Sequence, residues 1–188
     1  MSASTPTAPQ KWALVVGVGD YQDAGISDLP KAVNDARAIT QMLIAMPDGF
    51  PERNVLLLAD TEGEARAPTR ANMMRFLTSR LALVAEEDTV LVYFAGHGTT
   101  DGGALYLLPS DASLSNVAFT GFPFAQLEKV LEDTPARKKI LILDACHSGT
   151  GRATETMSDH AIAELERASE GMVTLASCSG EELSHEMP

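Results

Sequence analysis

The chain has 188 residues, of which 45% are hydrophobic, and its formal net charge is −12. This length and composition can bury one core of ordinary size, so we expect one folded domain. The negative charge argues against nucleic acid or an anionic membrane surface as a partner, and no apolar run approaches the roughly 20 residues of a membrane span.

The first ten residues are small and polar, and we expect a disordered leader there, followed by a folded region at residues 11–188. The leader lacks the apolar core of a signal peptide. The chain has two cysteines, Cys146 and Cys178, which make no disulfide framework. Both observations fit a reducing compartment, so we expect a cytoplasmic protein.

Apolar runs and helical repeats alternate along the rest of the chain. Apolar runs predict strands at residues 12–18, 54–59, 89–95, 105–108, 139–143 and 172–176. Apolar residues at helical spacing predict helices at residues 32–46, 70–84, 124–131 and 161–167. Thr69 is placed to N-cap the second helix, and the polar residues 150–160 predict a flexible loop.

This order of elements predicts an α/β fold. Strands alternate with helices, and the strands are continuous apolar runs, which is typical of a mainly parallel sheet covered by helices on both faces in a three-layer sandwich. After the run at 172–176 the chain continues only as a polar stretch. A doubly covered sheet rarely ends in an uncovered strand, so we expect the domain to be C-terminally incomplete and to miss its last strand.

Two of the predicted strands lead into residues with catalytic chemistry. The run at 90–95 leads to Gly96-His97-Gly98, and the run at 140–143 leads to Asp144-Ala145-Cys146-His147-Ser148-Gly149. In a parallel sheet the turns after both strands open at the same edge, so we expect Cys146 and His97 to lie together. A cysteine nucleophile requires such a neighbouring base, which also lowers the thiol pKa.

Structural roles for the same residues are less favoured. A buried cysteine is usually a small hydrophobe, but Cys146 ends an apolar run among small and polar residues. His97 lies between two glycines, where a structural histidine would pack poorly. Gly98 lets backbone N–H groups approach a substrate carbonyl, and with the N–H of Cys146 it would form an oxyanion hole. No Cys/His pair has zinc spacing, so we expect no metal site.

The motifs together resemble a known family. Tyr93-Phe94-Ala95-Gly96-His97-Gly98, followed about 50 residues later by Asp144-Ala145-Cys146-His147-Ser148-Gly149, is similar to the caspase-like peptidases called metacaspases and orthocaspases. The opening Gly17-Val18-Gly19-Asp20-Tyr21 and the later Asn34-Asp35-Ala36 resemble the same family. The resemblance spans residues 11–187. It implies a caspase-like fold with the large-subunit region and the start of the small-subunit region.

The resemblance implies a Cys–His peptidase that works through an acyl-enzyme, with Cys146 as nucleophile and His97 transferring protons. In animal caspases a glutamine at the position of Asp144 helps to bind aspartate at P1, the residue before the scissile bond. A carboxylate there would favour Arg or Lys. Asp35 matches a second acidic residue of the family's pocket for basic side chains, and Glu186 falls where animal caspases carry a pocket arginine. We therefore expect protein or peptide substrates with Arg or Lys at P1.

The resemblance also bears on cofactors and partners. Many metacaspases are activated by calcium through aspartates downstream of the catalytic histidine. This chain has Asp101 and Asp111 there, too few for a site of six or more oxygens, so we expect no cofactor, with calcium activation as the open alternative. The missing C-terminal small-subunit segment would be a partner if it is a separate chain.

Two other functions compete with the peptidase hypothesis. The chain would be a non-catalytic caspase-like interaction module if the pocket does not assemble without the missing strand. A nucleotide binder would use Gly17-Val18-Gly19, but no third glycine opens a helix and Asp20 would face the phosphates.

Overall fold

The computed structural model describes residues 8–147 and 172–176. Its strands are β1 (Lys11–Gly17), β2 (Val55–Ala59), β3 (Thr89–Asp101), β4 (Ala104–Leu107), β5 (Phe122–Pro123), β6 (Lys138–His147) and β7 (Met172–Ala176). Its α-helices are α1 (Pro30–Ala45), α2 (Arg70–Leu81), α3 (Val117–Thr120) and α4 (Phe124–Asp133). Short 3-10 turns are η1 (Glu52–Asn54), η2 (Asp60–Glu62), η3 (Glu64–Arg66) and η4 (Leu114–Asn116).

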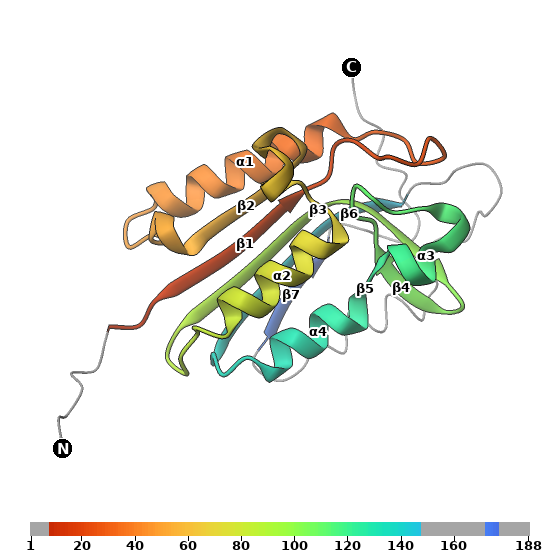
Figure 1. Cartoon of the computed structure of the whole chain (residues 1–188). Helices are drawn as coiled ribbons and strands as arrows, with labels where there is room; N and C mark the ends of the chain where they lie inside the picture. The colour runs from red at the N-terminus through yellow and green to blue at the C-terminus, as the bar shows by residue number, and fades with distance from the viewer. Residues whose placement is uncertain (1–7, 148–171, 177–188) are drawn as a thin grey trace.

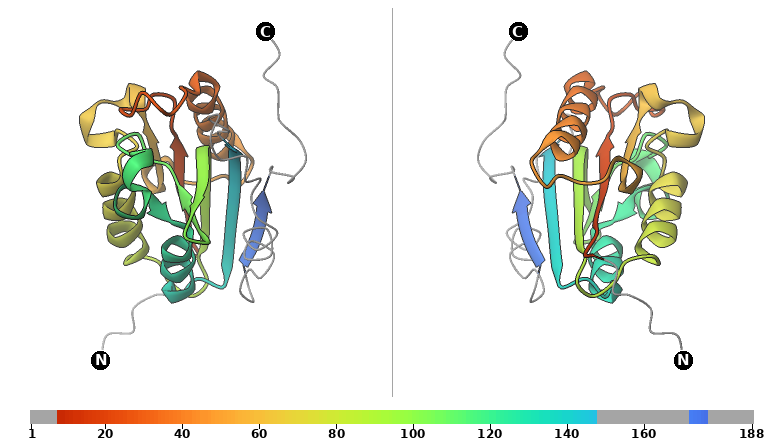
Figure 2. Two further views of the ribbon diagram at one scale, coloured as in Figure 1. Left: turned by 90° about the vertical axis from the view of Figure 1, so that its right-hand side faces the viewer. Right: turned by 90° about the vertical axis from the view of Figure 1, so that its left-hand side faces the viewer.

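The strands form one mainly parallel sheet (Figure 1). β2, β1, β3, β6 and β7 lie side by side in that order, and each neighbouring pair is parallel. β4 pairs antiparallel with the last residues of β3, and β5 pairs antiparallel with β4. Figure 2 shows α1 on one face of the sheet and α2 and α4 on the other. The predicted α/β sandwich with a mainly parallel sheet is confirmed.

Both faces of the sheet are buried, which explains why its strands are continuous apolar runs. Leu14 and Phe94 belong to the core beneath α2 and α4, whereas Val15 and Tyr93 belong to the core beneath α1. Successive side chains of a strand point to opposite faces, so a doubly covered strand needs apolar residues at every position.

Most predicted elements are present with small shifts at their ends. The Thr69 cap is confirmed, since its hydroxyl oxygen accepts the backbone N–H of Asn72 at 3.2 Å. Gln10 belongs to the folded part rather than to a disordered leader, because its N–H donates to Asp88 at 2.7 Å. The rest of the leader up to residue 7, the loop at 150–160 and the helix at 161–167 lie outside the described residues.

The turns predicted after residues 95 and 143 were wrong. β3 continues through Gly96-His97-Gly98 to Asp101, and β6 continues to His147. The physical reason is that the end of β3 pairs with β6 on one side and with β4 on the other, which keeps the backbone extended. The short α3 and β5 were not predicted. No helix in the described part of the chain is long and apolar enough to cross a membrane.

Candidate active site

His97 and Cys146 lie opposite each other on neighbouring parallel strands. The register of β3 and β6 pairs Gly96 with Ala145, His97 with Cys146, and Gly98 with His147. Neighbouring strands in a sheet are about 4.8 Å apart. The backbone therefore brings the predicted base and the predicted nucleophile together near the carboxyl end of the sheet, where β1 also ends (Figure 1).

The imidazole of His97 is held from one side by a backbone carbonyl. The residue is buried, with 4% of its surface exposed. Its Nε2 atom lies 2.9 Å from the carbonyl oxygen of Ser27, in the loop between β1 and α1. A carbonyl oxygen can only accept a hydrogen bond, so Nε2 carries the hydrogen and, in the neutral ring, Nδ1 is the nitrogen that can take a proton. This contact selects the tautomer that the predicted general base would need.

Tyr21, in the same loop, holds the backbone and the ring of His97. Its hydroxyl oxygen accepts the His97 backbone N–H at 2.9 Å, and the two ring centroids are 5.3 Å apart. Gly96 leaves room for this contact, because an added Cβ would lie 3.1 Å from the Tyr21 hydroxyl oxygen. Burial, and to a smaller extent the charges of Asp60 and Asp28, raise the pKa of Tyr21, so its phenol stays neutral.

Asp35 and Asp144, two predicted pocket residues, both act on Tyr93. Tyr93 lies in the core beneath α1, and burial is the main cause of its raised pKa. The charges of Asp144 and then Asp35 raise this pKa further, and the Tyr93 hydroxyl is hydrogen-bonded to the Asp144 carboxylate. Asp144 is half-buried and Asp35 is exposed. The structure thus gathers two carboxylates and a phenol beside β3.

The remaining predicted site residues are less well placed. Gly98 lies within β3, where its Cα partners are His147 of β6 and Leu107 of β4, and its role in an oxyanion hole stays a prediction. Glu186 lies outside the described residues, so its place in the pocket also stays a prediction.

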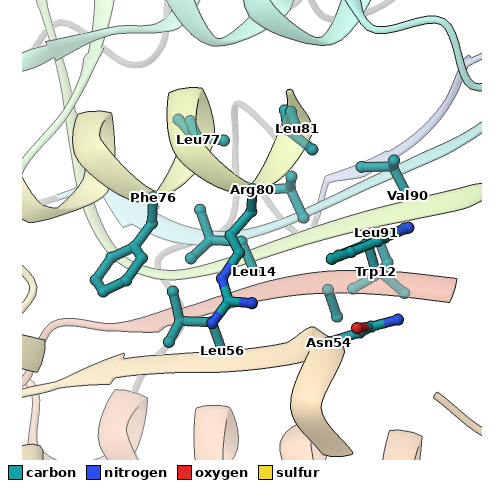
Figure 3. Close-up of a pocket in the computed structure, with 12 residues that line it drawn as sticks. Trp12, Leu14, Asn54, Leu56, Phe76, Leu77, Arg80, Leu81, Val90 and Leu91 are labelled. Atoms are coloured by element: carbon teal, nitrogen blue, oxygen red, sulfur yellow. The ribbon is translucent and has the colours of Figure 1, made fainter. Parts of the chain in front are cut away.

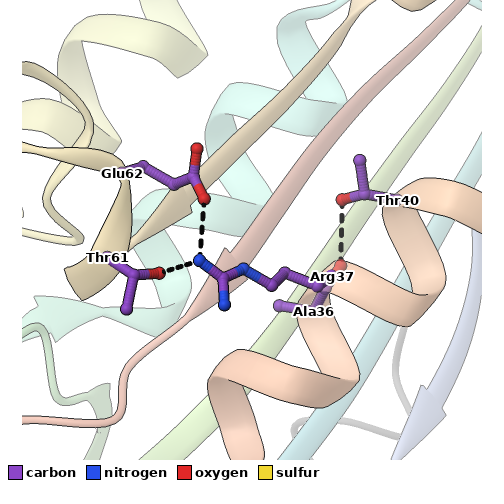
Figure 4. A network of polar contacts seen from close by, with 5 residues as sticks. All are labelled: Ala36, Arg37, Thr40, Thr61 and Glu62. Carbon is purple, nitrogen blue, oxygen red and sulfur yellow. Dashed lines mark hydrogen bonds and ion pairs between the residues drawn. The ribbon is translucent and has the colours of Figure 1, made fainter.

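A set of polar contacts connects α1 to the segment after β2 (Figure 4). Arg37 donates to Thr61 and forms an ion pair with Glu62 at 3.2 Å. Because Arg37 is on α1 close to Asp35, these contacts help to hold the helix that carries one of the two predicted pocket carboxylates.

The Gly17-Val18-Gly19 segment serves packing rather than phosphate binding. A Cβ at Gly17 would lie 2.6 Å from the carbonyl oxygen of Ala32, so this glycine allows α1 to approach β1. The Asp60 carboxylate accepts the N–H groups of Gly19 and Asp20 at 2.6 and 3.1 Å. Those amides already have an anionic partner, which removes the basis for the nucleotide-binding alternative.

The calcium candidates Asp101 and Asp111 have different surroundings. Asp111 accepts the backbone N–H of Arg70 at 2.8 Å, at the start of α2. Asp101 is exposed at the end of β3. Within residues 8–147 and 172–176, no group of three or more His, Cys, Asp or Glu side chains could hold a metal ion.

A small apolar pocket lies between α2 and the sheet, at the opposite ends of the strands from His97 (Figure 3). The space between its walls is about 310 Å³, which includes open solvent. Leu14, Leu56, Leu77 and Val90 are among its walls, with Asn54 and Arg80 as polar members. The lining contains no nucleophile and no base, so the pocket does not compete with the sheet edge as an active site.

The architecture and the His97–Cys146 register define a caspase-type α/β protein. Residues 10–188 match the caspase domain family. Metacaspase-4 and metacaspase-6 of Arabidopsis thaliana are 29% and 31% identical to the chain over 150 residues, which is 74% of this chain and 34% and 38% of those proteins. Metacaspase-1 of Eremothecium gossypii is 26% identical over 148 residues, covering 73% of this chain and 32% of that protein.

The chain belongs to the caspase domain family, and the resemblance to metacaspases is confirmed. It spans about a third of the length of these relatives, namely 34%, 38% and 32%.

Proposed function

We propose that this chain carries the catalytic centre of a cysteine endopeptidase that cuts proteins or peptides after Arg or Lys. The observation that supports it most is the register of His97 with Cys146, together with the 2.9 Å contact that holds His97 Nε2 on the Ser27 carbonyl. A nucleophile needs an adjacent base, and the base needs a group that orients it. Cys146, His97 and the loop that carries Ser27 all lie at the carboxyl ends of the parallel strands.

The proposed reaction uses the side chains of Cys146 and His97 and one water molecule. The Cys146 thiol gives its proton to His97, and the thiolate attacks the scissile carbonyl carbon to form a C–S bond. The imidazolium then gives the proton to the leaving amine as the C–N bond breaks, which leaves a thioester. His97 next takes a proton from water, whose oxygen attacks the thioester, and the thiol is restored as the new carboxylic acid leaves. No step requires a cofactor, so we propose that calcium is dispensable.

The two carboxylates beside Tyr93 support a basic P1 side chain. A planar guanidinium pairs well with carboxylate oxygens, and within the described residues the exposed Asp35 forms no ion pair. An aspartate at P1 would meet two like charges instead. We also propose that Glu186 contributes to this pocket and that the protein is cytoplasmic. A small-subunit segment would be a partner if it is a separate chain.

Cleavage of fluorogenic peptides that differ only in Arg, Lys or Asp at P1 tests the proposal, with and without a calcium chelator. We expect cleavage of the Arg and Lys peptides alone, abolished in Cys146→Ala and His97→Ala and retained in the matched control Cys178→Ala. Asp144→Ala should lose Arg cleavage by about a hundredfold, because a charged contact to the substrate is removed. Thermal unfolding of the same variant separates this loss from the cost of leaving the buried Tyr93 hydroxyl without its partner.

Other outcomes would contradict particular parts of the proposal. Efficient cleavage by the Cys146→Ala variant would exclude the proposed nucleophile, and preference for the Asp peptide would exclude the proposed pocket. An Arg chloromethyl ketone that fails to label Cys146 in a folded wild-type protein would favour the non-catalytic interaction module.

A further inference from the structure

The loop between β1 and α1 carries two groups that hold His97. Tyr21 accepts the His97 backbone N–H, and the Ser27 carbonyl accepts from Nε2. The placement of His97 therefore depends on the conformation of this loop, which is not part of the sheet and needs anchors of its own.

Asp23 supplies one of these anchors through both oxygens of its carboxylate. Oδ1 accepts the N–H of Gly25 at 2.9 Å, which closes a turn within the loop. Oδ2 accepts the hydroxyl of Ser113 at 3.0 Å and the N–H of Leu114 at 2.9 Å, which joins the loop to a segment some ninety residues later. These bonds, first that of Gly25 and then those of Leu114 and Ser113, lower the pKa of Asp23, so it is charged at neutral pH.

The segment that Asp23 reaches is itself attached to His97. The N–H of Leu108 donates to the His97 carbonyl at 2.8 Å. Ile26 of the loop is buried against Leu108, Ala112 and Val117 in a small separate core. The loop, this segment and His97 therefore form a closed set of contacts, in which the carboxylate of Asp23 joins the two chain segments.

We infer that Asp23 is a positioning residue for His97: it holds the β1–α1 loop against residues 113–114, so that the Ser27 carbonyl selects the His97 tautomer. The inference rests on the proposed function for its catalytic consequence. Without these bonds, the loop loses its connection to Ser113 and Leu114, and the Ser27 carbonyl is no longer fixed against Nε2. The imidazole can then adopt the other tautomer, whose Nδ1–H cannot accept a proton.

This role predicts a particular kinetic signature. Asp35 and Asp144 lie on α1 and β6 and do not depend on Asp23 contacts, so substrate binding should persist. In Asp23→Ala we expect kcat for an Arg peptide to fall by at least about tenfold, because small misplacements of a catalytic group are costly. The KM value should stay within about twofold.

Two further variants calibrate this effect. Asp23→Asn keeps one oxygen that can accept from Ser113 and Leu114 but offers an NH₂ group to Gly25, so its kcat should be intermediate. Asp101→Asn removes an exposed carboxylate at the end of β3 and should match the wild type. All three variants are measured in the full chain, with thermal unfolding as the control for folding.

Nitrogen-15 NMR of the His97 ring provides a readout that does not require activity, with the signal assigned from its loss in His97→Gln. The wild type should show the Nε2–H tautomer, and Asp23→Ala should show a mixture. Wild-type kcat in a folded Asp23→Ala variant, or an unchanged tautomer there, would overturn the inference. If the wild type cleaves no peptide, the proposed function fails, and the NMR comparison still decides whether Asp23 positions His97.

Discussion

Tyr93 connects the two carboxylates of the proposed pocket. Its hydroxyl is hydrogen-bonded to Asp144, and both Asp144 and Asp35 raise its pKa in addition to burial. A neutral phenol can only donate to a carboxylate, so the Tyr93 hydroxyl helps to orient Asp144.

Replacing this phenol should weaken substrate binding without slowing the chemistry. In Tyr93→Phe, we expect the KM of an Arg peptide to rise by about three- to tenfold and kcat to change by less than about twofold, which corresponds to the loss of one hydrogen bond. Tyr106→Phe, which changes a half-buried tyrosine of β4, is the matched control. A lower kcat with unchanged KM would instead place Tyr93 in the catalytic machinery.

The residues of the site differ in how far the sequence could predict them. Cys146 and His97 were predictable because reactive residue types follow apolar runs whose ends meet at one sheet edge. The contact between Ser27 and His97 could not be predicted, because it uses a backbone carbonyl, which every residue type has. Tyr93 was hidden because it lies in an apolar run and its ring serves the core, while only its hydroxyl reaches the carboxylates.

At the scale of elements, Asp88 joins the start of β1 to the turn before β3. The residue is 4% exposed. Its carboxylate accepts the N–H of Gln10 at 2.7 Å, the N–H of Ala85 at 2.9 Å and the indole N–H of Trp12 at 3.0 Å. Burial alone would raise the pKa of Asp88, but the three hydrogen bonds outweigh it and lower the pKa.

A lowered pKa in the folded state makes this link sensitive to acid. The stabilisation is complete above the ordinary aspartate pKa of about 4 and is lost as the pH falls through the lower folded value. We expect Asp88→Asn to reduce the free energy of unfolding at pH 7 by about 1–3 kcal/mol, because an amide cannot accept all three bonds. Urea denaturation at pH 7 and at about pH 3 would measure the free energy of unfolding of both proteins. The difference between variant and wild type should be smaller at the lower pH. An equal difference at both pH values would show that the charge of Asp88 is not the cause, and Asp101→Asn should match the wild type throughout.

The centres of the strands were largely predictable, whereas the ends of β3 and β6 were not. Strands covered on both faces are apolar at each position, so their centres are apparent from composition. Their ends depend on pairing instead. β3 extends past its apolar run because the turn at Gly102-Gly103 brings β4 back along its end, while β6 pairs with its other side. Both pairing partners lie outside Gly96-His97-Gly98, so these three residues alone do not predict the extension.

At the scale of the whole molecule, the net charge of −12 should act on the proposed substrates before they bind. An acidic protein attracts cationic ligands over distances comparable to the Debye length, which is roughly 10 Å at 0.1 M salt. Asp35 and Asp144, the carboxylates of the proposed pocket, would add a local contribution of the same sign as the overall field.

This predicts that salt affects substrates according to their total charge as well as their P1 residue. For an Arg peptide with additional Lys residues, we expect kcat/KM to fall several-fold as sodium chloride is raised from about 20 to about 500 mM, because screening removes the long-range attraction. A matched peptide with the same P1 Arg, but with Glu in place of the additional Lys, should show a small change or an increase. The kcat value of both peptides should be unaffected, since a bound substrate no longer depends on encounter. Equal salt dependence for the two peptides would mean that screening acts only on the pocket, and the overall charge would then have no part in substrate selection.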